Sequence, residues 1–89
     1  MRYLFIIEKA PQNYCGYFPD VPGCVAATKT VEKLLMMAAE ALACHFEDEP
    51  KLPRARSLAW HLDKKDLKLL PTDMVAWVAY TPEETLATA

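Results

Sequence analysis

The sequence YFPDVPGC, residues 17–24, joins two short stretches that are rich in strand-forming residues. Pro19 cannot donate a hydrogen bond to a neighbouring strand, so it is expected to end the strand before it. Pro22 and Gly23 suit a tight turn, because proline presets φ and glycine tolerates a positive φ. These residues are therefore predicted to form a rigid connection between two strands, and the Asp20 carboxylate is expected to accept hydrogen bonds from amides of its own turn.

The segments on either side of this connection have the pattern of β-strands, as do two further parts of the chain. Residues 2–8 place apolar side chains on both faces, which is typical of a strand that is covered on both sides. Residues 14–18 are rich in aromatics and follow a short polar break, so they are expected to pair with the first strand as an antiparallel hairpin. Residues 24–28 are the third predicted strand and residues 74–80 the fourth.

The longest predicted element is a helix that begins at Thr30 and ends near Phe46. Thr30 is the expected N-cap, because a threonine hydroxyl can accept a hydrogen bond from the amide three residues on. Met36 and Met37 fall outside the apolar face, and flexible thioethers there indicate a surface for self-association or for a partner. The apolar face has helical spacing and consists of Val31, Leu34, Leu35, Ala38, Ala41, Leu42 and Phe46.

The predicted elements follow one another as strand, strand, strand, helix, irregular segment and strand. This order indicates an α+β domain in which one helix packs on one face of an antiparallel sheet. At 89 residues the chain is predicted to be one domain over residues 1–80, with a loose tail at 81–89. Residues 54–68 are expected to hold one or two short helical turns, one capped by Ser57 and another by Asp63.

The composition narrows the classes of function. The net charge is −2, whereas a protein that binds phosphate backbones is usually basic, so nucleic acid is not the expected partner. An odd number of cysteines without a CxxC pair favours reduced thiols in a cytoplasm. The N-terminal apolar run is far shorter than the ~20 residues that cross a bilayer, so no membrane association is expected. The 53% apolar content predicts that another subunit or a partner covers part of the surface.

The sequence offers no recognisable catalytic or metal site, so no cofactor is expected. A cysteine nucleophile needs a nearby base, and no spacing ties His45 or His61 to Cys15 or Cys24. Cys44 lies next to His45 in the predicted helix, where adjacent side chains point about 100° apart and cannot readily share a metal ion.

Residues 51–68 form a basic stretch that surrounds Trp60. Aromatic and basic side chains together can contact nucleic acid. Acidic residues interrupt this stretch, however, so we interpret it as a surface segment that faces solvent. Contact with nucleic acid is left open at this point.

The sequence over residues 2–80 resembles the HicB-like antitoxin family, the small partners of HicA-type mRNA-cleaving toxins. The Pro-Asp-x-Pro-Gly-Cys sequence at residues 19–24, followed by a helix that starts at Thr30, is the most specific part of this resemblance. The other matching features are a first strand that ends in Ile7-Glu8-Lys9, the Ala39–Leu42 segment of the helix, Leu52-Pro53 and a late aromatic strand.

The resemblance implies a partial RNase H-like domain (βββαβ) that binds a toxin so as to cover its active site, without nuclease activity of its own. It also implies self-association to a dimer or larger, and a partner-contact role for Asp20, Val21 and Pro22. Many family members carry a further C-terminal DNA-binding segment. The sequence leaves no room for one before Ala89, so repression through such a segment is not expected.

Two alternatives remain open at the level of sequence. The first is a solitary oligomeric HicB-like domain without a toxin, held together by the methionine surface or by sheet edges. The second, held as a minor alternative, is a Mg²⁺-dependent RNase H-like nuclease that uses Glu8, Asp20 or Glu40. This second alternative requires the fold to bring at least two of these carboxylates together.

Overall fold

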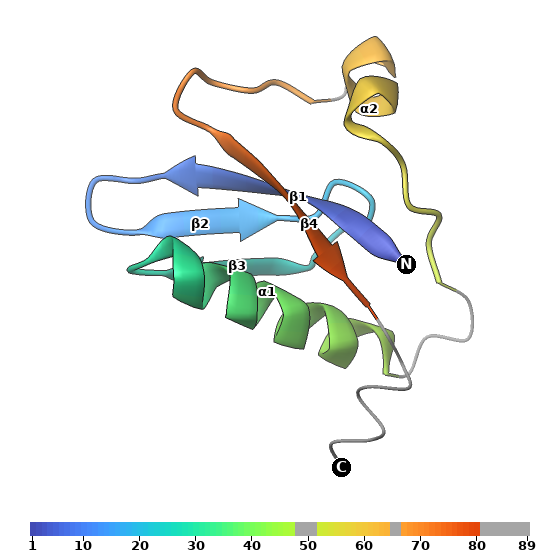
Figure 1. Ribbon diagram of the computed structural model, residues 1–89, viewed down its shortest axis with the longest axis horizontal. Helices are drawn as coiled ribbons and strands as arrows, with labels where there is room; N and C mark the ends of the chain where they lie inside the picture. Colours follow the sequence, from blue (N-terminus) through green and yellow to red (C-terminus); the bar gives the residue numbers. More distant parts are fainter. Residues whose placement is uncertain (48–51, 65–66, 81–89) are drawn as a thin grey trace.

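The computed structural model describes residues 1–47, 52–64 and 67–80 (Figure 1). Within these residues four strands and two helices follow in the order strand, strand, strand, helix, helix, strand. Their bounds are β1 Arg2–Lys9, β2 Tyr14–Tyr17, β3 Val25–Thr28, α1 Val31–Phe46, α2 Leu58–Lys64 and β4 Met74–Ala79. The predicted α+β class and the four predicted strands are confirmed. The expected tail at 81–89 lies outside the described residues.

The four strands form one antiparallel sheet in the order β3-β2-β1-β4. Strand β1 is therefore central, and its residues Tyr3 to Ile7 are at most 2% exposed. The hairpin of β1 and β2 pairs Ile6 with Tyr17, and β1 and β4 pair Leu4 with Trp77. Both predicted faces of the first strand are buried because a different layer covers each one.

Helix α1 covers the face of the sheet to which Tyr3, Phe5 and Ile7 point. Its buried residues, Leu34, Ala38, Leu42 and Phe46, follow the predicted helical spacing. Each large apolar side chain buried in this layer contributes about 1.5–3 kcal/mol relative to exposure. The Thr30 hydroxyl accepts a hydrogen bond from the amide of Lys33 at 3.2 Å, so the predicted N-cap is confirmed.

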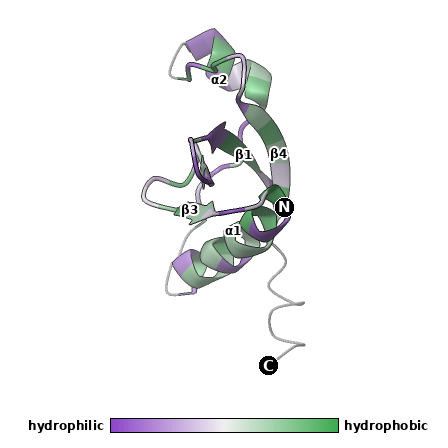
Figure 2. Cartoon of the chain, turned by 90° about the vertical axis from the view of Figure 1, so that its left-hand side faces the viewer, coloured by the Kyte–Doolittle hydropathy of each residue, from purple (hydrophilic) through white to green (hydrophobic). Residues whose placement is uncertain are grey.

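The opposite face of the sheet is covered in part by the segment around α2, which packs Leu58 and Leu67 against Leu4 and Ile6. Figure 2 shows α1 and α2 on opposite sides of the strands. The Ser57 hydroxyl caps α2 by accepting from the amide of Trp60 at 3.1 Å, as predicted.

The second predicted helical turn is not found where the sequence placed it. Asp63 lies inside α2 instead of capping another turn, and residues 67–70 are not helical. Residues 65 and 66, where that turn would begin, lie outside the described residues. In the described part of the chain, no helix has the length and apolar character that a bilayer crossing requires.

Candidate functional site

The connection between β2 and β3 is a loop closed by its own backbone. The Val21 amide donates to the Phe18 carbonyl at 3.1 Å, and the Cys24 amide donates to the Val21 carbonyl at the same distance. The second of these turns has Pro22 and Gly23 at its centre, and Gly23 has a φ of 86°. Proline followed by a residue with positive φ is the pattern of a type II turn. Residues 18–24, called the docking loop below, are thus held in one conformation by their own backbone hydrogen bonds.

Asp20 anchors the docking loop to a distant part of the chain. One carboxylate oxygen accepts a hydrogen bond from the amide of Arg56 at 2.7 Å, and the other lies 2.8 Å from Nε2 of His61. The Asp20 and His61 side chains are only 5% and 3% exposed. This differs from the expected bonding to local amides, because the turn amides of Val21 and Cys24 are already bonded to backbone carbonyls.

Tyr3 makes a further connection to the same distant segment. Its hydroxyl donates to the carbonyl of Pro53 at 2.7 Å, so the central strand β1 also holds residues 52–56 in place. Burial raises the pKa of Tyr3, and the negative charge of Asp20 adds to the shift. A protonated phenol therefore remains available as the donor across the neutral range.

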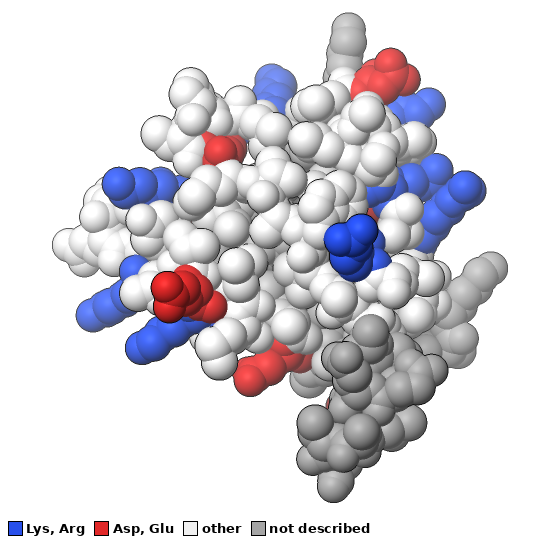
Figure 3. All heavy atoms as spheres, viewed as in Figure 1, with Lys and Arg blue, Asp and Glu red and all other residues white. Residues whose placement is uncertain are grey.

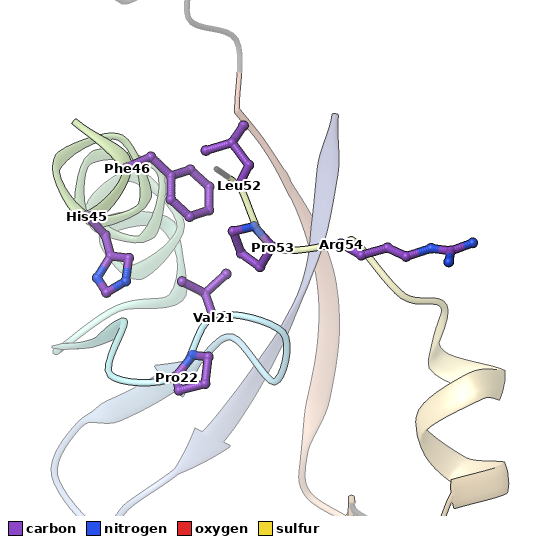
Figure 4. Close-up of a pocket in the computed structure, with 7 residues that line it drawn as sticks. All are labelled: Val21, Pro22, His45, Phe46, Leu52, Pro53 and Arg54. Carbon is purple, nitrogen blue, oxygen red and sulfur yellow. The ribbon is translucent and has the colours of Figure 1, made fainter. Parts of the chain in front are cut away.

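A largely apolar hollow of about 500 Å³ lies between the docking loop, the end of α1 and residues 52–54 (Figure 4). Val21 is 1% exposed and lies at the floor of the hollow, while Pro22 is exposed. Figure 4 shows the Arg54 side chain pointing away from the other labelled residues. The hollow is lined by Val21, Pro22, His45, Phe46, Leu52, Pro53 and Arg54.

A second hollow, of about 340 Å³, lies against the docking loop and includes Tyr17 and Leu67 in its lining. Val21 and Pro22 contribute to both hollows. The docking loop is thus a rigid ridge between two concave surfaces, an arrangement that suits insertion of apolar side chains from another protein.

The three predicted partner-contact residues have different orientations. Asp20 and Val21 point into the protein, and only Pro22 is exposed. Met36 and Met37 are 66% and 46% exposed on α1 and line neither of the two hollows at the docking loop. The structure therefore presents two separate surfaces, and the sequence did not indicate that Phe46 or Leu52 would form part of the first one.

The basic stretch 51–68 is organised around Trp60. The guanidinium of Arg56 lies 4.4 Å from the centre of the indole ring and the Lys64 ammonium lies 5.8 Å from it. Cations at these distances are attracted to the face of an aromatic ring. Two of the described cations are therefore engaged with Trp60, whereas Lys51 and Lys65 lie outside the described residues.

The acids considered for a nuclease do not converge. Both oxygens of Asp20 have protein partners, while Glu8 and Glu40 are exposed on β1 and α1. Glu8 alternates with Ile7 and so points to the side of the sheet opposite α1. Within residues 1–47, 52–64 and 67–80 no group of three or more His, Cys, Asp or Glu side chains could hold a metal ion.

Two of the three cysteines share a hollow with a histidine. Cys24, Cys44 and His45 line a shallow hollow of about 240 Å³. Burial raises the pKa of Cys24, which is only 3% exposed, and so disfavours its thiolate. No hydrogen bond joins His45 to either sulfur in the described part of the chain, so a cysteine–histidine nucleophile is not assembled.

Comparison of the sequence and fold with known proteins shows the family of this chain. The sequence model of HicB-like antitoxins of bacterial toxin–antitoxin systems matches residues 3–80. An uncharacterized 14.9 kDa protein from the rep–hol intergenic region of Haemophilus phage HP1 (strain HP1c1) is 32% identical over 72 residues. That match covers 76% of this chain and 54% of the phage protein, so the chain spans about half the length of this relative.

Three solved structures have the same fold. A chain of the HicA3 and HicB3 toxin–antitoxin complex is 27% identical with a TM-score of 0.68, covering 92% of this chain and 100% of that one. The antitoxin HicB3 is 28% identical with a TM-score of 0.73, covering 94% and 65%. The N-terminal domain of Burkholderia pseudomallei antitoxin HicB, at 18% identity and a TM-score of 0.75 over 91% and 99%, shows the fold alone. The chain that carries the docking loop therefore belongs to the HicB-like antitoxin family.

Proposed function

We propose that this chain is an antitoxin domain that binds a HicA-type mRNA-cleaving toxin and inhibits it by covering the active site of the toxin. Family membership over residues 3–80 is the observation that carries the proposal. The similarity to a chain of the HicA3 and HicB3 complex at 27% identity supports it. In this proposal the chain acts by binding and performs no catalysis.

The docking loop is the proposed contact surface. It is closed by backbone hydrogen bonds and anchored through Asp20, so little conformational entropy is lost when a partner immobilises it. Pro22 would contact the toxin directly, Val21 would form the floor beneath an inserted side chain, and Asp20 would hold the two walls of the hollow together. The volume of about 500 Å³ accommodates a large apolar side chain of a partner.

The negative net charge of this chain also favours a toxin as its partner. A toxin that grips RNA needs basic groups to neutralise phosphates, and this chain has a net charge of −2. Opposite net charges accelerate the encounter of two proteins and disfavour partners of the same sign. Figure 3 shows that charged side chains lie mostly toward the margins of one face, with uncharged residues between them. The proposed interface is therefore steered by charge and held by apolar contacts.

The experiment that tests the function first asks whether a reading frame beside this gene encodes a HicA-type toxin, and then combines that toxin with this chain and a labelled mRNA. Addition of an equimolar amount of this chain is expected to abolish RNA cleavage, and the two proteins are expected to co-elute. Cleavage that continues at full rate in the presence of excess chain would refute the proposal.

A matched set of variants locates the surface. Pro22→Glu places a charge at the rim of the hollow and is expected to weaken toxin binding by about tenfold or more, which corresponds to 1.4 kcal/mol. Leu62→Glu is the control, because Leu62 on α2 is 48% exposed and lines neither hollow at the docking loop. Met36→Glu tests the second exposed surface. If Met36→Glu weakens binding and Pro22→Glu does not, the toxin contacts α1 and the docking loop is not the interface.

A further inference from the structure

Strand β4 is an edge of the sheet with an unpaired outer side. Its neighbour in the sheet is β1, and no other strand of the described residues lies beside it. The Tyr80 amide donates to the Met1 carbonyl at 2.8 Å, so the backbone of Tyr80 points toward β1. Because backbone direction alternates along a strand, the amides and carbonyls of Val75, Trp77 and Ala79 point outward.

This edge lacks the features that usually prevent edge strands from pairing. Natural edge strands carry lysine or proline, contain a bulge, or are very short. Residues 74–80 carry no charge and no proline, and β4 runs for six residues. Val75 and Trp77 are 38% and 46% exposed, and Figure 2 shows β4 along one side of the molecule in largely hydrophobic colours.

The opposite edge of the sheet is different. Strand β3 has four residues and is followed by the exposed Lys29. A strand of this length offers few backbone groups to another strand. The flanking charge does not distinguish the two edges, because Asp73 directly precedes β4. The two edges are therefore unequal, and β4 is the one suited to pairing.

We propose that β4 pairs with β4 of a second copy of this chain, antiparallel about a two-fold axis centred on Trp77. Trp77 then faces Trp77 of the second copy, and Val75 faces Ala79. Facing residues of this type exchange two hydrogen bonds, so every outward amide and carbonyl of the three residues finds a partner. The two sheets become one continuous sheet across the dimer.

A second copy fits this edge better than an unrelated partner. The pairing is self-complementary, and no charged side chain is brought opposite its own copy, which would be destabilising. A two-fold contact of β4 with β4 closes after two copies, whereas β4 adding to β3 would continue without end. A dimer of standard size needs about 800 Å² from each copy. This area is roughly one eighth of the 6321 Å² surface of one copy. At the start of β4, the exposed side chains of Met74 and Leu70 extend the apolar area.

The dimer and the docking loop use different parts of the molecule. The docking loop joins β2 to β3, and β1 lies between β2 and β4 in the sheet. Pairing through β4 therefore leaves a docking loop free in each copy. The dimer is expected without any toxin, so it stands or falls independently of the proposed function.

Cysteine cross-linking tests the register. In a background with Cys15→Ser and Cys44→Ser, the double variant Val75→Cys with Ala79→Cys is expected to form a covalent dimer under mild oxidation. Each single variant is the matched control, because two copies of residue 75 would be about 13 Å apart along the strands, beyond disulfide reach. Absence of the covalent dimer in the double variant, or equal yields from the single variants, would overturn the register.

Light scattering tests the surface. The unmodified chain is expected to be a dimer, and Trp77→Lys is expected to raise the dimer dissociation constant at least about a hundredfold through two like charges at the axis. Val25→Lys is the control, because it adds the same charge to β3 at a residue that is 64% exposed. Circular dichroism checks that both variants are folded. The proposal is contradicted if the unmodified chain is a monomer. It is also contradicted if Val25→Lys loses the dimer to the same extent as Trp77→Lys.

Discussion

The carboxylate of Asp20 lies 2.8 Å from the imidazole of His61, although 41 residues separate them in the chain. This contact and the bond from the Arg56 amide hold an otherwise irregular segment against the docking loop. Because both side chains are almost fully buried, the loss of either one would leave the other buried without this polar contact. The shape of the hollow beside Pro22 therefore depends on a polar contact beneath it.

Replacement of Asp20 tests this dependence. Asp20→Ala is expected to lower the free energy of unfolding by about 3 kcal/mol, because it removes one member of a buried pair and also leaves the Arg56 amide unbonded. Asp20→Asn should cost less, since its amide oxygen can still accept from that amide. Urea unfolding gives the values. Glu8→Ala is the control and should change stability by less than about 0.5 kcal/mol, as exposed sites do. An equally small effect of Asp20→Ala would show that the contact does not stabilise the fold.

The two glycines are expected to resist substitution for different reasons. A Cβ added at Gly16 would lie 2.0 Å from the tip of the Phe5 ring, whereas at Gly23 it would meet nothing within 4 Å. Gly16→Ala is therefore expected to cost about 1–3 kcal/mol through overpacking. Gly23→Ala is expected to cost about 1–2 kcal/mol through its positive φ.

A double-mutant cycle separates these causes. Phe5→Leu shortens the side chain that meets Gly16, so it should relieve part of the cost of Gly16→Ala and none of the cost of Gly23→Ala. Thermal or urea unfolding of the single and double variants measures the coupling. Additive losses for Phe5→Leu and Gly16→Ala would mean that the ring moves freely out of the way.

Local patterns were sufficient to predict the main elements. Helix α1 follows from apolar residues at helical spacing and from the Thr30 cap, and β1 follows from its alternating apolar faces. The type II turn at Pro22 and Gly23 needs only the conformations of those two residues. In each of these cases the residues that determine the structure are close in sequence, so the pattern is visible before the fold is known.

The partners of Asp20 could not be predicted in this way. Arg56 and His61 lie 36 and 41 residues away, in a segment without regular periodicity, and their approach depends on the packing of that segment over β1. The hollow beside Pro22 shares this limitation, because Leu52 and Pro53 form one of its walls. The turn at residues 18–24 could be predicted from its own sequence, whereas the residues that the fold brings against it from elsewhere could not.

The cysteines are expected to differ in reactivity. Cys44 is exposed, whereas Cys24 is 3% exposed and burial raises the pKa of its thiol. Only the thiolate reacts with alkylating reagents, so Cys24 should react at least about tenfold more slowly than Cys44 at neutral pH. Mass spectrometry of peptides after brief iodoacetamide treatment measures both rates. In urea the two rates should become similar, and fast labelling of Cys24 in the folded protein would contradict its burial.

Alkaline pH is expected to destabilise the fold through its tyrosines. Burial raises the pKa of Tyr3, and burial together with the charges of Glu8 and Asp73 raises that of Tyr17. Their contribution to stability is fully present below the unfolded-state pKa of about 10 and is lost as pH rises through the higher folded-state pKa values.

Tyr3→Phe should cost about 1 kcal/mol of unfolding free energy at neutral pH, because the bond to the Pro53 carbonyl is lost. The same variant should make the alkaline decline in stability shallower. Urea unfolding between about pH 8 and pH 11 measures both effects, with Tyr17→Phe as a companion variant that flattens the decline without touching that bond. An alkaline decline of unchanged slope in both variants would show that neither phenol is held in its protonated form by the fold.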